Sequence, residues 1–244
     1  MKQELLTITE NVPVTKTVYR MRLEGADLEE QRPGGFVNIR LDGLFLRRPI
    51  SVYDSGPGSL TILYKVVGRG TAQMAGLRPG DTLDVLTGLG NGYDLSKAGD
   101  RPLLLGGGVG VPPLYLLAKQ LRAAGKDVHA VLGFNTAEEV FGEEAFRTLG
   151  CGVTVATADG SRGVKGFVTD ALPEEYSYFY TCGPEPMLRA VYRTAKTSGQ
   201  FSFEERMGCG FGACMGCSCK TITGYKRICR EGPVLEKEEI LCFD

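Results

Sequence analysis

The sequence predicts a small antiparallel β-barrel, then an α/β domain with a doubly wound parallel sheet, then a small cysteine-rich module at the C-terminus. Three observations predict this order. Apolar and polar residues alternate in short stretches through the first hundred residues. Strand-like and helix-like patterns alternate over the next hundred, and five of the eight cysteines fall within residues 209–229. We place the three regions at residues 1–99, 100–200 and 201–244.

The first region is predicted to consist of short strands. Apolar and polar residues alternate over residues 19–23 and 37–41, which is the pattern of strands with one buried face. Further strands are expected at residues 59–67 and 82–86. Glycine- and proline-rich turns separate these stretches, for example at residues 33–35. Many short, evenly spaced strands are typical of a small barrel.

Near residue 100 the pattern changes to strands that alternate with helices. Residues 103–105 are three leucines, a buried-strand signal, and a glycine turn and an apolar helix follow them. Alternation at this spacing is typical of a doubly wound parallel sheet. The other expected strands are residues 128–133, 153–157 and 178–181, and the other expected helices are residues 137–149, 166–172 and 186–197.

The composition is that of an ordinary globular protein and excludes several classes of function. The net charge is −1, so no basic surface for nucleic acid is expected. No stretch approaches the roughly 20 apolar residues of a membrane span, and the N-terminus lacks the apolar stretch of a signal peptide. We therefore expect a cytoplasmic protein with no nucleic-acid or membrane partner. Eight cysteines in that compartment indicate metal or redox chemistry and argue against a disulfide framework.

The cysteines near the C-terminus have the spacing of a metal cluster site. Cys209-x4-Cys214-x2-Cys217 is the plant-type [2Fe–2S] spacing, which needs a fourth cysteine downstream. Glycines surround these residues, because a loop wrapped on a cluster needs unusual backbone angles and N–H groups turned toward sulfur. A structural zinc site with four thiolates is the alternative. Zinc ribbons usually pair two short CxxC knuckles, however, and only one is present here.

Three cysteines are candidates for the fourth ligand: Cys219, Cys229 and Cys242. Cys219 lies two residues from Cys217, so their side chains would point to opposite sides of an extended chain. Cys229 follows a turn at Gly224, and the chain can fold back there onto the first three ligands. We favour Cys229 and expect Cys219 and Cys242 to be dispensable for the cluster.

A glycine-rich loop lies between the first strand and the first helix of the α/β region. It runs over residues 106–113, Gly-Gly-Gly-Val-Gly-Val-Pro-Pro, and its glycines let the phosphates of a dinucleotide approach the helix N-terminus. The loop departs from the G-x-G-x-x-G fingerprint, because Val111 or Pro113 occupies the position of the third glycine. A second segment, Thr-Cys-Gly-Pro-Glu-Pro-Met at residues 181–187, strengthens the interpretation as a nucleotide-binding domain.

Together these segments resemble the ferredoxin reductase-like flavoproteins, in which a flavin-binding barrel precedes a nicotinamide-binding α/β domain. The barrel signature Arg-x-Tyr/Phe-Ser is matched by Arg48-Pro49-Ile50-Ser51, with Ile50 in place of the aromatic residue. The resemblance implies that Arg48 holds the FAD pyrophosphate and that Ser51 lies near the reactive edge of the flavin. The further flavin-contacting residues that it implies are Leu63, Tyr64, Lys65, Gly70 and Thr71.

The same resemblance implies a nicotinamide nucleotide in the α/β domain. We expect NAD and not NADP, because no basic cluster suited to a 2′-phosphate follows residues 133–135. Asp159 is in addition suited to a ribose hydroxyl, whereas Arg162 is a counterargument. The other residues implied in nucleotide binding are Gly107, Gly108, Gly110, Cys182 and Gly183.

One branch of this family carries a C-terminal [2Fe–2S] tail: the electron-transfer subunits of B-type dihydroorotate dehydrogenase. The chain is similar to this branch over essentially its whole length. The tail is the specific part of the match, because generic ferredoxin reductases have no cluster tail. The resemblance assigns the cluster to Cys209, Cys214, Cys217 and Cys229. The matching segments are residues 47–51, 106–113, 158–161, 204–214 and 229–234.

This resemblance implies a function for the whole chain. A partner subunit with FMN would oxidise dihydroorotate to orotate, and electrons would pass through the cluster and FAD of this chain to NAD⁺, in pyrimidine synthesis. The subunits of such enzymes form a two-plus-two heterotetramer. The order of modules agrees with this route, because a nicotinamide exchanges two electrons as hydride, a cluster exchanges one at a time, and flavin converts between them.

Other functions stay open at this point. One is a related iron–sulfur flavoprotein subunit that links NAD(P)H to a hydrogenase, a sulfide dehydrogenase or a ferredoxin. Another is a non-catalytic module with structural zinc. No group of histidine, serine and carboxylate residues indicates acid–base catalysis, and the only histidine, His129, is expected to be packed in a strand. We therefore assign no catalytic residue.

Overall fold

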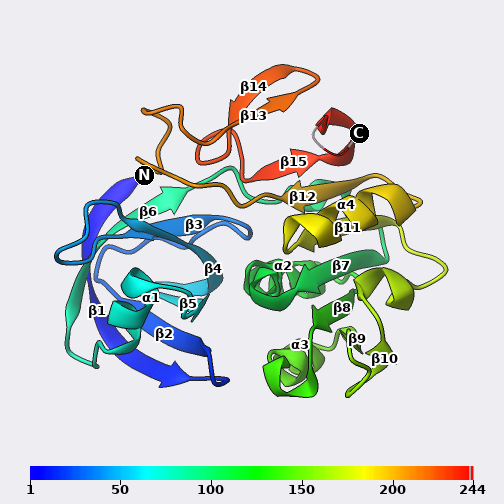
Figure 1. Cartoon of the computed structure of the whole chain (residues 1–244), viewed down its shortest axis with the longest axis horizontal. Helices are drawn as coiled ribbons and strands as arrows, with labels where there is room; N and C mark the ends of the chain where they lie inside the picture. Colours follow the sequence, from blue (N-terminus) through cyan, green and yellow to red (C-terminus); the bar gives the residue numbers. More distant parts are fainter. Residues whose placement is uncertain (242, 244) are drawn as a thin grey trace.

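The N-terminal region folds into a closed antiparallel barrel in the computed structural model, which describes residues 1–241 and 243 (Figure 1). The strand order is β1-β2-β5-β4-β3-β6, and pairing of β6 with β1 closes the barrel. A short helix, α1 (Arg69–Ala75), follows β5. The strands are β1 (Lys2–Pro13), β2 (Val18–Glu24), β3 (Phe36–Ile39), β4 (Arg48–Gly56), β5 (Ser59–Lys65) and β6 (Thr82–Leu89).

Apolar and polar residues alternate along the strands, and the apolar side chains fill the inside of the barrel. In β5, Leu60, Ile62 and Tyr64 belong to the barrel core, whereas Leu63 belongs to the core of the neighbouring α/β domain. The four strands predicted from this alternation are confirmed as β2, β3, β5 and β6, with ends shifted by up to three residues. The barrel therefore buries one face of each strand inside and uses part of the other face to contact the next domain.

The second region forms a sheet with strand order β10-β9-β8-β7-β11-β12-β15. Its strands run parallel except β15, which pairs antiparallel with β12. The strands are β7 (Pro102–Gly107), β8 (His129–Phe134), β9 (Gly152–Thr157), β10 (Val164–Lys165), β11 (Tyr178–Cys182), β12 (Gly199–Ser202) and β15 (Val234–Glu236). The helices are α2 (Pro112–Ala123), α3 (Glu143–Thr148) and α4 (Glu185–Thr194).

Helices cover both faces of this sheet (Figure 1). Leu104 of β7 shares a buried cluster with Leu117 of α2 on one face. Leu103 and Leu105 share the opposite cluster with Leu188 of α4. Because neighbouring residues of a strand point to opposite faces, three consecutive leucines are buried only in a sheet that is covered twice. The predicted doubly wound sheet is confirmed, with an antiparallel edge strand that the sequence did not predict.

The helix expected over residues 137–149 is wrong in its first half. Residues 137–139 form an isolated 3-10 turn, and the α-helix starts only at Glu143. The interruption lies at Gly142, whose φ of +80° is outside the right-handed helical region. The apolar residues Val140 and Phe141 still pack inward, so their spacing mimicked a continuous helix.

The helix expected over residues 166–172 is a 3-10 turn at Val168–Ala171. Gly166 has a φ of +128°, and the Asp170 carboxylate accepts the backbone N–H of Phe167 at 2.8 Å. This side-chain bond closes a tight turn in place of a helical start. The last expected helix is confirmed as α4, which ends at Thr194, three residues earlier than predicted.

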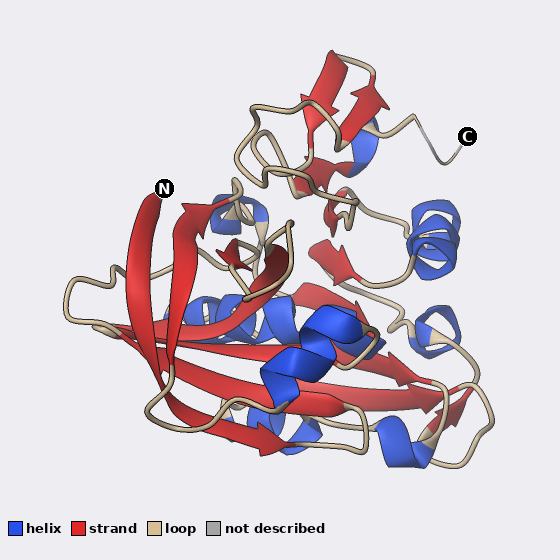
Figure 2. Cartoon of the chain, turned by 60° about the vertical axis from the view of Figure 1, so that its left-hand side comes forward, coloured by secondary structure: helices blue, strands red, loops and turns tan. Residues whose placement is uncertain are grey.

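The C-terminal region lies across the barrel and the sheet, and Figure 2 shows it as a mostly loop-built module at one end of the molecule. Its hairpin consists of β13 (Ser218–Thr221) and β14 (Gly224–Arg227), after which the chain returns to the sheet as β15. Strand β12 crosses the predicted boundary between residues 200 and 201. The division at residues 99, 200 and 244 therefore stays a prediction.

In the described part of the chain, no helix combines the length and the apolar character needed to cross a bilayer.

One carboxylate, that of Glu236, holds strand β15 to the rest of the sheet. Glu236 of β15 accepts hydrogen bonds from Lys97 at 2.6 Å, from Gln200 at 2.7 Å and from the Tyr178 hydroxyl at 2.7 Å. Burial by itself raises the pKa of Glu236, but these donors outweigh it and lower the pKa below the ordinary value. The ionised form therefore joins the tail to the sheet.

We expect Glu236→Gln to lower the free energy of unfolding by about 1–2 kcal/mol at pH 7, because it replaces charge-assisted hydrogen bonds. A depressed folded-state pKa stabilises the protein above the unfolded-state pKa of about 4.3. That contribution is lost as the pH falls through the folded-state pKa. Urea unfolding at pH 7, 5 and 4 measures the difference, with exposed Glu238→Gln as the control. A difference that does not shrink at acidic pH would contradict this account.

Candidate functional site

Two adjoining cavities lie where the barrel, the sheet and the tail meet. The first, which we name the barrel cavity, has a volume of about 370 Å³ and is lined mainly by β4, β5 and residues 202–207. The second, which we name the loop cavity, has a volume of about 490 Å³ and is lined mainly by the glycine-rich loop and the ends of β8 and β11. Both include Lys65, Val109 and Glu204 in their walls, so the two spaces adjoin.

The barrel cavity brings together most residues that the sequence assigned to a flavin. Arg48 lies beside Gly70, where any Cβ would overlap its guanidinium. Gly70 itself is outside the wall. Thr71 reaches the wall, but its hydroxyl also accepts the backbone N–H of Val67 at 2.9 Å and caps the start of α1. The predicted residues in this wall are Arg48, Pro49, Ile50, Ser51, Leu63, Tyr64, Lys65 and Thr71.

The donor set of the barrel cavity fits FAD. One guanidinium, Arg48, stands among largely apolar wall residues such as Ile50 and Leu63. A guanidinium suits a pyrophosphate, and an apolar wall with a few polar groups suits a flat ring system. The small residue at Gly70 is needed for this placement, because a side chain there would push the guanidinium away.

The loop cavity has a backbone cradle at Gly107, Gly108 and Gly110. Gly108 has a φ of +52° and open space where a Cβ would lie. At Gly110 a Cβ would overlap the Cys182 carbonyl, so only glycine lets the loop pack on the end of β11. Helix α2 begins with Pro112 and its neighbour proline, which have no N–H. Backbone donors to a phosphate must therefore come from the loop, and this cradle fits a dinucleotide.

The remaining predicted nucleotide residues have different positions. Gly183 lines the loop cavity, whereas Cys182 is 1% exposed and lies behind the wall. Burial raises the pKa of the Cys182 thiol well above its ordinary range, so the thiol is neutral and shapes the wall. Asp159 is outside both walls and accepts the Ser161 hydroxyl at 2.6 Å. Its contact with a ribose stays a prediction.

Sequence reasoning missed several wall residues of the loop cavity, among them Glu139, Phe167 and Glu204. Phe167 lines the cavity and is 66% exposed, and it belongs to no sequence motif. Glu204 faces both cavities, and burial by the surrounding protein raises the pKa of its carboxyl. Arg162, the counterargument to NAD, forms an ion pair with Glu143 at 2.5 Å.

The predicted cluster ligands come together as two pairs. The backbone N–H of Cys209 points to the Cys214 sulfur at 3.5 Å, and that of Cys214 points back to the Cys209 sulfur at 3.4 Å. In the second pair, the Cys229 N–H points to the Cys217 sulfur at 3.4 Å. The first pair lies toward solvent, whereas Cys217 and Cys229 are each 2% exposed.

Backbone N–H groups around the first cysteine pair favour the thiolate form of Cys209 over the thiol. Burial raises the pKa of Cys209, but hydrogen bonds from the N–H groups of Cys214, Phe211 and Ala213 outweigh it and lower the pKa to about 6. Gly212 directs its N–H to Cys229, which links the two pairs. Its φ of +94° makes this orientation accessible to glycine.

Two pairs of thiols fit a two-iron cluster, in which four cysteines serve two metal ions. Among the described residues, no three cysteine, histidine or carboxylate side chains converge on one point as a single-ion site requires. Cys219 lies on β13 opposite Lys226, with its sulfur 3.7 Å from the Lys220 carbonyl oxygen. Cys242 lies outside the described residues.

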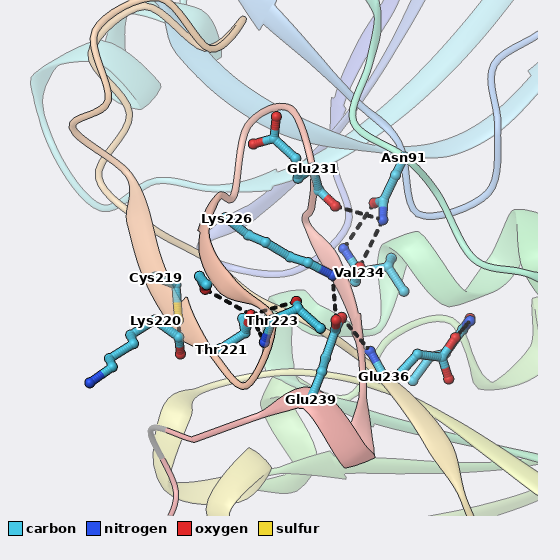
Figure 3. A network of polar contacts seen from close by, with 12 residues as sticks. Asn91, Cys219, Lys220, Thr221, Thr223, Lys226, Glu231, Val234, Glu236 and Glu239 are labelled. Atoms are coloured by element: carbon cyan, nitrogen blue, oxygen red, sulfur yellow. Dashed lines mark hydrogen bonds and ion pairs between the residues drawn. The ribbon is translucent and has the colours of Figure 1, made fainter.

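The segment with the four predicted ligands, residues 209–229, which we name the cluster loop, is anchored to both domains. Phe36, a wall residue of the barrel cavity, and Phe201 of the sheet share one buried core with Cys217, Ile228 and Cys229. Asn91, in the segment that leads from the barrel to the sheet, donates to the carbonyls of Glu231 and Val234 and accepts the N–H of Val234 (Figure 3). These contacts fix the tail over the junction of the two cavities.

A barrel with a flavin-type cavity, a parallel sheet with a glycine-loop cavity and a four-thiol tail define a ferredoxin reductase-like protein with an iron–sulfur module. The model of the iron–sulfur cluster binding domain of dihydroorotate dehydrogenase B matches residues 204–241. The "Dihydroorotate dehydrogenase B (NAD(+)), electron transfer subunit" of Geobacillus sp. (strain WCH70) is 44% identical over 256 residues, covering 99% of each chain. The chain belongs to the family of dihydroorotate dehydrogenase B electron transfer subunits.

Solved structures agree with this family. An NADH-dependent reduced ferredoxin-NADP oxidoreductase, determined for insight into flavin-based electron bifurcation, superimposes with a TM-score of 0.89 and 32% identity. The superposition covers 98% of this chain and 90% of that chain. The flavohem-like FAD/NAD binding domain of nitric oxide dioxygenase from Vibrio cholerae shares the fold, with a TM-score of 0.68, 22% identity and coverage of 78% and 91%.

The ligand set makes a prediction for iron content. We expect Cys209→Ser, Cys214→Ser, Cys217→Ser and Cys229→Ser each to lose iron, because each removes one thiolate of a pair. Cys219→Ser is the matched control and should keep it. Iron and zinc analysis with visible absorbance measures the outcome. Iron retained in Cys229→Ser but lost in Cys219→Ser would overturn the assignment.

The guanidinium in the barrel cavity makes a second prediction. Arg48→Ala should weaken FAD binding by about 10- to 100-fold, because a charge-assisted hydrogen bond is worth about 1.5–3 kcal/mol. Flavin fluorescence during titration of the apoprotein measures the affinity. Arg20→Ala, an exposed barrel arginine paired with Glu10, is the control and should bind FAD normally. Equal affinities in the two variants would contradict the assigned role.

Proposed function

We propose that this chain is the electron transfer subunit of a dihydroorotate dehydrogenase B and carries electrons from a catalytic subunit to NAD⁺. Its redox groups are a [2Fe–2S] cluster and FAD. The catalytic subunit contains FMN, and two copies of each subunit form a heterotetramer that serves pyrimidine biosynthesis in the cytoplasm. Family membership supports the subunit role, and reduced thiolates of the kind the cluster needs persist in that compartment.

The order of the three sites in space carries this proposal. The loop cavity and the barrel cavity share Lys65, Val109 and Glu204 in their walls. The barrel cavity in turn reaches Phe36, whose ring packs in one core with the buried ligand pair Cys217 and Cys229. The sites proposed for nucleotide, flavin and cluster thus adjoin one another without an intervening domain, and this arrangement supports electron transfer between them.

The residues of the chain hold and separate these groups. The guanidinium of Arg48 would bind the FAD pyrophosphate, and Ile50 and Leu63 would exclude water from the ring. Gly108 and Gly110 would let the nucleotide phosphates approach the backbone of the loop. When bound, FAD supplies the conversion between two-electron hydride exchange and one-electron exchange.

The partner's docking face lies, in this proposal, at the outer side of the cluster loop. Cys214 is exposed there, and Phe211 and Met215 expose 42% and 53% of their surfaces on the same loop. Apolar side chains beside an exposed ligand suit a partner that exchanges single electrons with the cluster. The buried pair, Cys217 and Cys229, faces the barrel instead.

A second function is favoured by one observation, the TM-score of 0.89 to an NADH-dependent reduced ferredoxin-NADP oxidoreductase. In that alternative the chain is a related iron–sulfur flavoprotein subunit whose cluster serves a hydrogenase, a sulfide dehydrogenase or a ferredoxin. The two functions differ in the partner and not in this chain. Co-purification of the native complex therefore separates them.

Co-expression with a candidate dihydroorotate dehydrogenase subunit should yield a stable complex that reduces NAD⁺ with dihydroorotate. Each subunit alone should lack this activity, because the electron route is then incomplete. NADH formation at 340 nm measures the reaction, and mass measurement of the complex tests the two-plus-two composition. A native partner without an FMN-type dehydrogenase barrel would reject the preferred function.

A further inference from the structure

A single buried amide joins the flavin-binding barrel to the cluster loop. Asn38 of β3 is 1% exposed, and its side-chain N–H donates to the Cys209 carbonyl at 3.1 Å, across 171 positions of sequence. Asn38 lies outside both the Arg48–Ser51 signature of the barrel and the cysteine motif of the tail. Its oxygen, Oδ1, is buried and has no hydrogen-bond partner among the described residues.

The position of Asn38 in the sheet places it on the flavin side. Val37 and Ile39 belong to the barrel core, so Asn38 points outward between them. It pairs with Pro49 of β4, and the next outward residue, Phe36, pairs with Ser51. Phe36, Pro49 and Ser51 all line the barrel cavity. One outward face of β3 and β4 thus forms the cavity wall and the contact to Cys209.

The surroundings of Asn38 hold it in place. Arg47 donates to the Asn38 carbonyl at 3.3 Å and is itself fixed by Asp84, whose carbonyl and carboxylate it contacts at 2.9 Å each. On the tail side, Gly210 has a φ of +79°, and a Cβ there would overlap the Asn38 amide nitrogen. The contact therefore needs glycine at position 210 and a rigid strand beneath it.

Packing alone does not account for an amide at this position. A buried amide whose oxygen has no hydrogen-bond partner destabilises a protein relative to an apolar residue of similar shape. Local violations of this kind are found where function requires them. The one bond that Asn38 makes to the tail ends on the backbone of a predicted cluster ligand, Cys209.

We propose that Asn38 is a positioning residue for electron transfer between flavin and cluster: its amide holds the Cys209 carbonyl against the outer wall of the barrel. The proposal rests on the proposed function. The bond fixes the end of the cluster loop that carries Cys209 and Cys214, while the Phe36 core fixes the end that carries Cys217 and Cys229. Without it, no other hydrogen bond of the described residues ties this end of the loop to the barrel, because the bond from Arg227 to the Gly212 carbonyl lies within the tail itself. The spacing between the two groups is then no longer held from the barrel side.

Two variants test the proposal in the protein loaded with FAD and cluster. Asn38→Leu removes the donor together with the unpartnered acceptor, so the barrel should stay folded. Asn38→Asp keeps the shape but sets a carboxylate against the Cys209 carbonyl. Gln31→Leu is the matched control, because Gln31 is a buried barrel amide bonded to Glu29 and Gly88 and not to the tail.

Anaerobic stopped-flow mixing with NADH separates flavin reduction from cluster reduction. We expect both Asn38 variants to reduce flavin at the wild-type rate but to reduce the cluster about tenfold more slowly or worse, as small misplacements of reacting groups do. Backbone amides of residues 208–214 should also exchange hydrogen faster, and the reduced cluster should show an altered electron paramagnetic resonance spectrum. Gln31→Leu should lower the thermal midpoint and leave cluster reduction unchanged.

Unchanged cluster reduction in both Asn38 variants at full iron and flavin content would overturn the proposal. Loss of iron in both variants would overturn it as well, because Asn38 would then serve assembly and not positioning. A wild-type protein whose cluster is not reduced by NADH would instead reject the proposed function itself.

Discussion

The structure depends on one shared apolar core that joins the tail to the two domains. Phe36 of the barrel and Phe201 of the sheet lie in the same buried cluster as Cys217, Ile228 and Cys229. Burial of this kind is worth roughly 25 cal/mol per Å² of apolar surface, so the tail is held by packing even where it has little regular structure. Because two of the predicted ligand thiols, Cys217 and Cys229, are part of this core, the packing that completes the fold also sets where the predicted cluster site lies.

Polar contacts give that packing its precision. Glu236 ties the return strand to the sheet through three donors, and Asn91 holds the segment before it by two donated bonds and one accepted bond. Asn38 contacts the opposite end of the tail at Cys209. Apolar contacts tolerate sliding, whereas hydrogen bonds fix direction and distance. A module that exchanges electrons with a neighbouring site needs both kinds of contact.

Local rules account for the sequence predictions that were confirmed and for those that were wrong. The alternation of apolar and polar residues in the barrel strands and the three leucines of β7 indicate which side chains are buried. Both patterns depend only on residues that are close together in the sequence. The helix expected at residues 137–149 was wrong because Val140 and Phe141 have helical spacing, while Gly142 takes a left-handed backbone angle. Nothing in the apolar pattern distinguishes a helix from a turn whose side chains also point inward.

The sequence by itself determined the cysteine spacing, the glycine loop and the Arg48–Ser51 signature, because each is a short motif whose chemistry depends on neighbours in the chain. The tertiary structure alone decided that Glu204 and Lys65 stand in the walls of both cavities. It also decided that β15 joins the sheet as an antiparallel edge and that Asn38 meets Cys209. These contacts link residues far apart in sequence, and their positions follow from how the packed cores bring separate segments together.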